Sequence, residues 1–427
     1  MTRFDAALPP PTADALAASE ALAARIATRI DAAGGWLGFD TYMAMALYEP
    51  GLGYYAGGSL KLGAGGDFVT APELSGLFGA CLARQCAAWF ADCSPRVIEF
   101  GAGSGALAAQ LLEAFARLGL TEVEYLIVEV SGELAARQRE RLARDCPAAL
   151  PRVRWLDALP ERIEGVVIGN EVLDAMPVRA FAVATVEGGG PRVLERGVVR
   201  TPSGFAWGLR DAPEPFARQV LARLAQGAGI DDVADRACVG ELGEQAEAWV
   251  GAVGRRLVRG AMLLIDYGFA RPAFYHAQRT MGTLMCHYRH RAHGDPFLLP
   301  GLQDITAHVD FTAIAQAGLD AGLTVLGFTS QARLLLNLGV LDELAARLAG
   351  VDPPEASRPT ADAVGVARSV PAADAAARAR VLETRAAQQL LSEAEMGELF
   401  KALALGRSLD DPGPGFARGD RPLALAP

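Results

Sequence analysis

Short apolar runs alternate with helix-like segments through the middle of the chain. The apolar runs have the length of strands and cover 97–100, 125–128, 153–156 and 165–169. Amphipathic segments at 106–112 and about 132–144 separate them. Two later strands are predicted at 261–266 and 323–328. Strands that alternate with helices predict an α/β fold with a parallel, doubly wound sheet, whose ligands bind at the carboxyl ends of the strands.

The flanking segments divide the chain of 427 residues into further parts. Helical patterns at 10–32 and 75–89 predict an N-terminal helical segment, and about ninety residues between 170 and 261 predict an inserted α+β subdomain. The predicted parts are an N-terminal helical and loop segment over the site (1–92), a ligand-binding core (93–175 and 261–340), an inserted substrate subdomain (176–260), and a linker with a C-terminal helical segment (341–427). Residues 267–308 read as a long polar loop, and 378–405 read as helical.

A glycine-rich turn follows the first core strand. Glu99 ends the strand, and Gly101, Gly103 and Gly105 come at alternate positions before the next helix. Glycines there let the backbone turn sharply and approach a ligand closely. The spacing also fits a loose dinucleotide fingerprint. An acid two residues before the first glycine favours S-adenosylmethionine, because its carboxylate can hold the cationic amino-acid end of that cofactor.

Acidic residues follow the next strands as well. Glu129 ends the second strand, where a ribose diol would lie, and Asp157 follows the third, where it could reach an adenine amino group. Asp157 alone could equally be a helix cap or a solvated loop residue. Acids after three successive strands are typical of class I methyltransferases. The alternative to a methyltransferase that stays open is an oxidoreductase that binds a dinucleotide.

Composition and charge argue against nucleic-acid binding and membrane insertion. The net charge is −10, and the chain has no basic run that would indicate nucleic-acid binding. No apolar stretch reaches membrane-spanning length, and the N-terminus does not resemble a signal peptide. The six cysteines form no C-x-x-C pair. These features predict a cytoplasmic protein without membrane insertion.

Several further motifs occur in order and carry a family resemblance. They are Leu47–Tyr55, Gly66–Glu73, the Glu99 loop, Asn170–Val178, Ile265–Gly268, Gly282–Leu284 and Gly301–Phe311. Together they resemble the MidA-like methyltransferases, a family that includes a mitochondrial complex I assembly factor that methylates an arginine. The resemblance covers about residues 15–340. It implies a Rossmann-like class I fold, S-adenosylmethionine as cofactor and protein arginine methylation, with a respiratory complex subunit as a candidate partner.

Candidate substrate residues follow the fourth strand. Glu171 and Asp174 could hold a guanidinium through forked hydrogen bonds, and a helical turn would place both on one face. Alternatively, Asn170 and Asp174 shape the loop and Glu171 is solvated. Asn170 and Asp67 are expected at the cofactor, although Asp67 could instead form an Asx turn. Three histidines at 287, 290 and 293 suggest a zinc site, but the interleaved Arg289 and Arg291 argue against one, and we predict no metal.

Two other functions stay open at this point. The chain could be an assembly or scaffold protein that binds the cofactor with little turnover, or a methyltransferase for a small molecule. The inserted subdomain and the polar loop favour a bulky protein substrate over a small one. Exposed helices and the linker are compatible with a homodimer.

Overall fold

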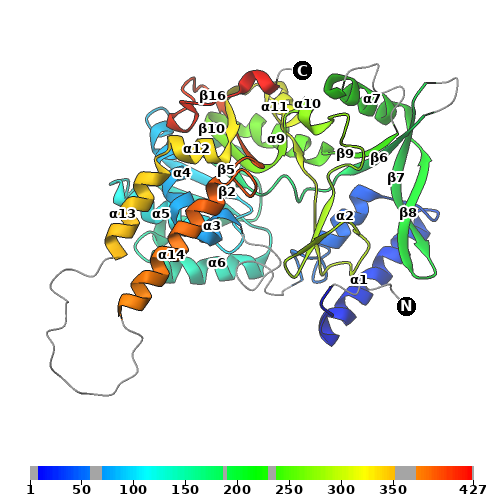
Figure 1. Cartoon of the computed structure of the whole chain (residues 1–427), viewed down its shortest axis with the longest axis horizontal. Helices are drawn as coiled ribbons and strands as arrows, with labels where there is room; N and C mark the ends of the chain where they lie inside the picture. Colours follow the sequence, from blue (N-terminus) through cyan, green and yellow to red (C-terminus); the bar gives the residue numbers. More distant parts are fainter. Residues whose placement is uncertain (1–7, 58–69, 186–189, 229–236, 352–371, 426–427) are drawn as a thin grey trace.

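The computed structural model describes residues 8–57, 70–185, 190–228, 237–351 and 372–425. A large mixed sheet and a smaller antiparallel sheet each carry their own helices, so the chain has two lobes (Figure 1). A third, three-stranded sheet lies with the smaller lobe.

The large sheet holds the predicted strands. Its order is β15 (Thr324–Ser330), β16 (Phe400–Arg407), β10 (Leu257–Phe269), β5 (Ile163–Asn170), β2 (Arg96–Phe100), β3 (Glu124–Val128) and β4 (Val153–Leu156). The short β14 (Val309–Asp310) pairs with the end of β10. Strands β4, β3, β2, β5 and β10 run parallel, while β16 is antiparallel to both of its neighbours. From β2 the chain adds β3 and β4 on one side of the sheet and then crosses over to add β5 and β10 on the other side. This reversal makes a topological switch point between β2 and β5.

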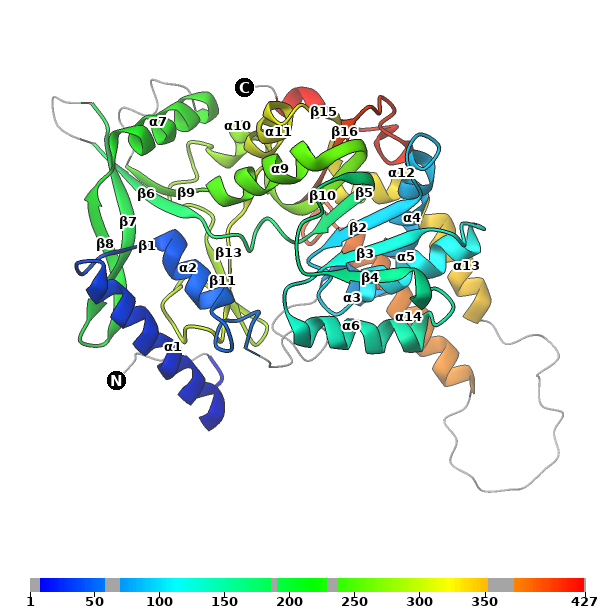
Figure 2. The same cartoon turned by 180° about the vertical axis from the view of Figure 1, so that it is seen from behind.

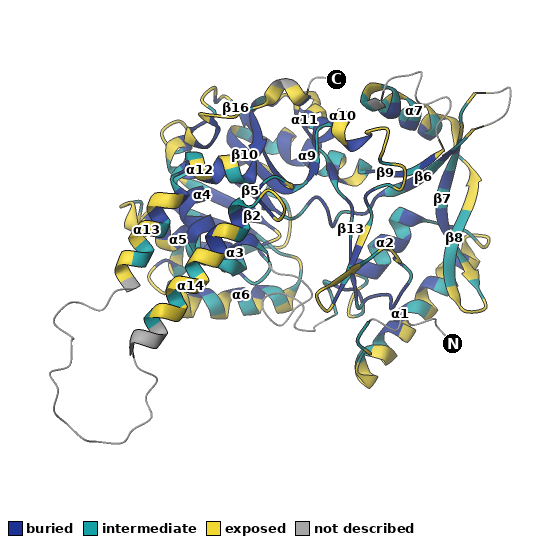
Figure 3. Ribbon diagram, in the orientation of Figure 1, coloured by how far each residue is buried: buried dark blue, intermediate teal, exposed yellow. Residues whose placement is uncertain are grey.

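Helices cover both faces of this sheet (Figure 2). One face packs against α4 (Leu77–Trp89), α5 (Ala106–Arg117), α6 (Gly132–Asp145), α12 (Gln331–Asn337), α13 (Val340–Val351) and α14 (Ala372–Leu391). The other packs against α9 (Glu244–Arg256) and α11 (Phe311–Asp320). Because both faces are covered, the central strands are mostly apolar, and Figure 3 shows them buried.

The smaller lobe combines residues that lie far apart in the sequence. Its sheet contains β1 (Leu37–Gly38), β7 (Arg192–Thr201), β6 (Arg179–Ala184), β9 (Cys238–Leu242) and β8 (Gly204–Asp211). Helices α1 (Ala13–Ala32) and α2 (Phe39–Tyr48) pack against it, with α7 (Glu214–Ala228) and α10 (Arg271–Phe274) on a second cluster. The three-stranded sheet contains β11 (Met285–Tyr288), β12 (Arg291–His293) and β13 (Asp304–Thr306).

This lobe differs from the predicted division of the chain. The segments 13–48 and 179–242 form one structure, because Leu37 pairs with Val198 and Gly38 with Gly197. The segment 267–308, which we expected to be a polar loop, contains α10 and the three-stranded sheet. Its strands are only three or four residues long, so their apolar period is too brief to detect.

The C-terminal segment also differs from the expectation. We predicted helix over 378–405, outside the core, but the helix ends at Leu391 and Phe400–Arg407 forms β16 inside the large sheet. The sequence Phe-Lys-Ala-Leu-Ala-Leu is rich in Ala and Leu, which favour helices in isolation. Pairing with β10 on one side and β15 on the other overrides that preference.

The position of β16 predicts a large stability effect. Leu403 is completely buried, so Leu403→Ala should lower the free energy of unfolding by about 2–5 kcal/mol. The same substitution at Leu382 on α14, which is 65% exposed, is the control and should change it by less than about 0.5 kcal/mol. Urea unfolding measures both, and equal effects would contradict the assignment of β16 to the core.

Candidate active site

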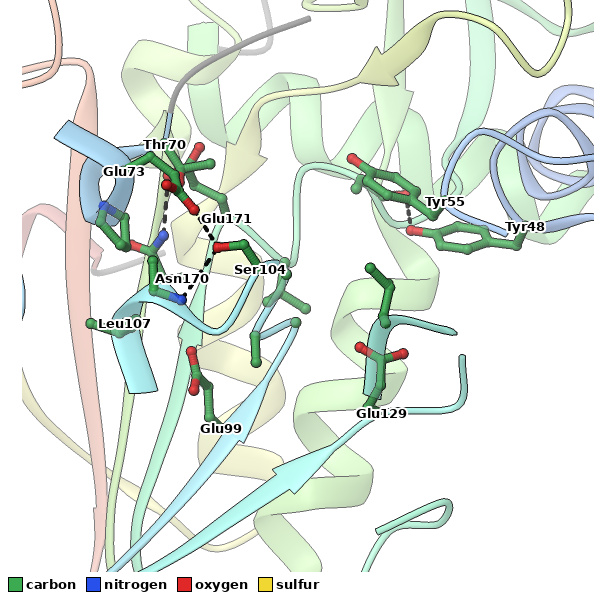
Figure 4. A pocket seen from close by; sticks show the side chains of 18 residues that line it. Tyr48, Tyr55, Thr70, Glu73, Glu99, Ser104, Leu107, Glu129, Asn170 and Glu171 are labelled. Carbon is green, nitrogen blue, oxygen red and sulfur yellow. Dashed lines mark hydrogen bonds between the residues drawn. The ribbon is translucent and has the colours of Figure 1, made fainter. Parts of the chain in front are cut away.

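A cavity of about 210 Å³ lies at the carboxyl ends of β2, β3 and β5 (Figure 4). Its wall is built from the glycine-rich turn after β2, the ends of β3 and β5, the short helix α3 (Ala71–Leu74), and two tyrosines of the smaller lobe. The lining residues include four carboxylates, Glu73, Glu99, Glu129 and Glu171. None of the lining residues in the described part of the chain is Lys or Arg. The cavity is therefore suited to a ligand that carries positive charge.

The glycine-rich turn has the backbone that its sequence predicts. Gly101, Gly103 and Gly105 have φ angles of 66°, 52° and 80°, a left-handed conformation that side chains with a Cβ rarely adopt. A Cβ on Gly101 would lie 2.7 Å from Val172 Cγ2, in the segment that follows β5. Gly105 then precedes α5, whose N-terminus faces the same turn. Glycine at 101 thus serves two needs, the φ angle and the contact with Val172.

Glu99 ends β2 and is almost completely buried. Its Oε2 accepts a hydrogen bond of 2.7 Å from the Tyr125 hydroxyl on β3. Burial raises the pKa of Glu99 to about 7, although the Tyr125 hydrogen bond lowers it somewhat. A cationic group in the cavity would favour the ionised form. This arrangement fits the predicted contact with the amino-acid end of the cofactor.

Glu129 follows β3 on the neighbouring wall. Its Oε1 accepts from the backbone N–H of Ser131 at 2.8 Å, and its Oε2 accepts from Gln138 Nε2 at 3.1 Å. Burial raises its pKa, and both hydrogen bonds oppose that effect. Each oxygen of a carboxylate has a second lone pair, so Glu129 can still accept from a ribose diol.

Asn170 and Glu171 form the wall at the end of β5. Asn170 Nδ2 donates to Glu171 Oε1 at 3.1 Å, whereas the buried Asn170 Oδ1 has no hydrogen-bond partner in the described part of the chain. Glu171 has a φ angle of 53°, which is unusual for a residue other than glycine. Burial, together with the nearby Asp266, raises the pKa of Glu171 to about 8, although hydrogen bonds from Asn170 and the Ala71 backbone oppose the rise.

Asp174 does not lie beside Glu171 on a helical face. The segment after β5 consists of bends and turns rather than a helix, and Asp174 is buried behind the cavity wall. There it lies close to Asp266 and Asp304, and burial together with these carboxylates raises its pKa well above the usual value. The expectation that Glu171 and Asp174 face the substrate together is therefore wrong, because the turn after β5 is not helical. Of the two carboxylates, Glu171 lines the cavity and Asp174 does not.

Sequence reasoning missed other residues of the site. Asp266 accepts hydrogen bonds from the turn after β5. The sequence marked this residue only as part of the Ile265–Gly268 motif of the resemblance. Ser104 and Arg141 join Glu73 in a cluster that connects α3, the glycine-rich turn and α6, with Arg141 Nη1 2.8 Å from Ser104 Oγ. Tyr48 and Tyr55 stack with ring centroids 5.5 Å apart. Their aromatic type and their place in the Leu47–Tyr55 motif of the resemblance marked these tyrosines in advance.

The other predicted residues are placed elsewhere. Asp157 is exposed at the end of β4 and does not line the cavity, and Asp67 lies outside the described residues. Of the histidines, His287 and His293 lie on paired strands and His290 in the turn between them. The part of the chain that the structure describes contains no group of three or more His, Cys, Asp or Glu side chains placed to hold a metal.

Residues 81–329 match a family described as "Putative S-adenosyl-L-methionine-dependent methyltransferase". The chain belongs to this family. Curated relatives include the protein arginine methyltransferase NDUFAF7, mitochondrial, of Danio rerio, which is 28% identical over 339 residues, 73% of this chain and 75% of the relative. The protein of the same name from Mus musculus is 28% identical over 326 residues, 70% of each chain.

Solved structures extend the match to nearly the whole chain. A methyltransferase-like protein from Burkholderia thailandensis bound to S-adenosyl-homocysteine is 48% identical, with a TM-score of 0.84 over 97% of this chain and 99% of that one. A native structure from the same organism is 49% identical, with a TM-score of 0.82 and the same coverage. The predicted family and the class I methyltransferase fold are confirmed. No helix in the described residues is long and apolar enough to span a membrane.

S-adenosylmethionine is the cofactor of this family member, as the glycine-rich turn and the acids after three successive strands predicted. The residues of the cavity fit it. Glu99 offers a buried carboxylate for the amino group, Glu129 offers acceptors for the ribose, and Gly101 and Gly103 in the left-handed turn line the cavity without a side chain. The individual contacts of these residues, and of Asn170, with the cofactor stay predictions.

Gly101 provides a test of the cofactor site. Gly101→Ala should weaken S-adenosylmethionine binding, because its Cβ would push Val172 toward the cavity. Gly119→Ala is a matched control, since Gly119 has a φ of 77° but nothing within 4 Å of a Cβ. Both changes should cost about 1–2 kcal/mol of stability through the left-handed backbone. Calorimetric titration should show weaker binding for Gly101→Ala alone, and equal affinities for both variants would contradict this role.

Proposed function

We propose that this methyltransferase transfers the methyl group to an arginine side chain of a partner protein. The observation that carries the proposal is the wall at the end of β5, where Glu171 lines the cavity as a hydrogen-bond acceptor and Asn170 Nδ2 donates to its Oε1 at 3.1 Å. A guanidinium has five N–H donors and no acceptor, so it matches this surface. The curated relatives named protein arginine methyltransferases support the same substrate class.

Charge also favours a cationic substrate. Glu171 lines the cavity and no described lining residue is basic, although Glu73 beside it is already paired with Arg141. Phosphorylated or carboxylated substrates would be repelled by this surface. The second lobe places Tyr48 and Tyr55 on the opposite wall from Asn170 and Glu171 (Figure 4), where a protein segment could pack against their rings.

In methyl transfer, residues of the site must bind the guanidinium, orient its reacting nitrogen and remove a proton from it. The cofactor supplies a methyl group already activated on a sulfonium. Glu171 holds the guanidinium and fixes the direction of the nucleophilic nitrogen, while Asn170 Nδ2 holds the Glu171 carboxylate. As the nitrogen gains the methyl group it loses a proton, and the ionised Glu171 carboxylate is placed to take it.

Two other functions compete with this proposal. A scaffold protein that binds the cofactor without turnover would need no acceptor wall beside the cofactor site. A small-molecule methyltransferase would be served by a closed pocket, whereas here a lobe built from two distant segments lies beside the cavity. A respiratory complex subunit as partner, a cytoplasmic location and a homodimer stay predictions.

Glu171→Gln tests the substrate role. The variant should bind S-adenosylmethionine nearly as well as the wild type, because the carboxylates at the cofactor end, Glu99 and Glu129, are untouched. Transfer to arginine-containing peptides should fall by about 100-fold, since the carboxylate that holds the guanidinium and accepts its proton is gone. Asp157→Asn, at an exposed acid outside the cavity, is the control and should transfer normally. Loss of cofactor binding in Glu171→Gln would move this residue out of the substrate role.

The raised pKa of Glu171 predicts a pH dependence. Below about pH 8 the ligand-free enzyme holds this carboxyl protonated, and the protonated form cannot pair with a guanidinium. The kcat/KM for an arginine peptide should therefore rise with pH and level off above about 8, because kcat/KM reports groups of the free enzyme. Initial rates between pH 6 and 9 measure this, and a flat profile would contradict it.

A further inference from the structure

The turn after β5 is fixed by a carboxylate from the neighbouring strand. Asp266 lies on β10, which pairs in parallel with β5 so that Ile265 is opposite Asn170. Asp266 is completely buried and does not line the cavity. Its Oδ2 accepts backbone N–H groups from Val172, Leu173 and Asp174, at 3.1, 2.8 and 3.3 Å.

Three successive N–H groups around one oxygen form an anion-binding nest, here filled by a side chain of the protein itself. Asp266 Oδ1 accepts a fourth backbone N–H, from Tyr267, at 2.8 Å. Burial raises the pKa of Asp266 to about 7, and these backbone donors oppose the rise. The ionised form is the one that can accept all four bonds.

The nest begins one residue after Glu171, whose own backbone N–H donates to Ile265 O at 2.9 Å. Residues of β10 thus hold Glu171 on both sides. Ile265 O accepts the N–H of Glu171 itself, and Asp266 accepts the N–H groups of the three residues that follow it. Between these two anchors its backbone takes the left-handed φ of 53°. An isolated glutamate has no reason to adopt this conformation, so the surrounding bonds must enforce it.

We propose that Asp266 is a positioning residue for methyl transfer, because its carboxylate holds the 172–174 amides and thereby turns Glu171 toward the substrate. The proposal rests on the proposed function, in which Glu171 binds the substrate guanidinium. It predicts that Asp266 acts through Glu171 and not through the cofactor. The same turn carries Val172 against Gly101, so its position is also defined relative to the cofactor loop.

Asp266→Asn is the variant of choice. The amide has the same shape but keeps only one acceptor oxygen, so it cannot serve both the nest and Tyr267. We expect S-adenosylmethionine affinity close to wild type by calorimetry and faster hydrogen exchange at the amides of 172–174. Transfer to an arginine peptide should fall about 100-fold in kcat/KM, as for a displacement of about 1 Å in a reacting group.

A double-mutant cycle separates positioning from a general structural role. If Asp266 acts through Glu171, then Asp266→Asn should cause little further loss in a Glu171→Gln background. Multiplicative losses would overturn the proposal, as would unchanged exchange at 172–174. Asp420→Asn is the matched control, because Asp420 Oδ1 also accepts a backbone N–H, from Phe328 at 2.7 Å, but on β15, two strands beyond β10. It should leave exchange at 172–174 and transfer unchanged.

The wild-type protein gives a test that does not need the variant to fold. The amide of Leu173 should exchange as slowly as those of the central strand β5, and rapid exchange there would overturn the proposal. If the wild type methylates no arginine peptide, the proposed function fails, while the exchange and calorimetric measurements still decide whether Asp266 holds the turn.

Discussion

The rest of the structure depends on a group of carboxyl side chains that the large sheet gathers at one edge and largely removes from water. Glu99 lies near the end of β2, Glu171 directly follows β5 and Asp266 lies within β10, and burial raises the pKa of each to between about 7 and 8. Each carboxylate is stabilised by donors that the fold supplies, a tyrosine hydroxyl, an asparagine amide or backbone N–H groups. The raised pKa values keep these carboxyls partly protonated in the ligand-free enzyme, and a cationic ligand would favour the ionised forms of Glu99 and Glu171, which line the cavity.

The two ends of the cavity divide this charge between cofactor and substrate. Glu99 and Glu129 lie with the glycine-rich turn, whereas Glu171 lies with α3 and the turn after β5 (Figure 4). The contact between Gly101 and Val172 connects the two ends directly. A shift of either turn is therefore transmitted to the other through packed atoms, because a close-packed contact cannot be compressed.

The sequence predicted the parts of the site whose signals are local. The apolar runs at 97–100 and 153–156 are strands with nearly the predicted bounds, and the glycines after Glu99 have the expected left-handed backbone. The role of Asp266 could not be predicted, because it depends on the register that sets Ile265 beside Asn170. The expected pairing of Glu171 with Asp174 failed for a related reason. The turn conformation is imposed by β10 and is not encoded in the spacing of the two acids.

The antiparallel strand β16 has a consequence for the order in which the chain can fold. Strands β10 and β15 do not pair with each other and are joined only through residues 400–407. During synthesis, the edge of β10 therefore stays open while more than a hundred residues beyond it are made. An apolar strand with an open edge can pair with other chains. The half of the sheet that builds the cofactor site can assemble early, but its protection from aggregation depends on a segment that is synthesised late.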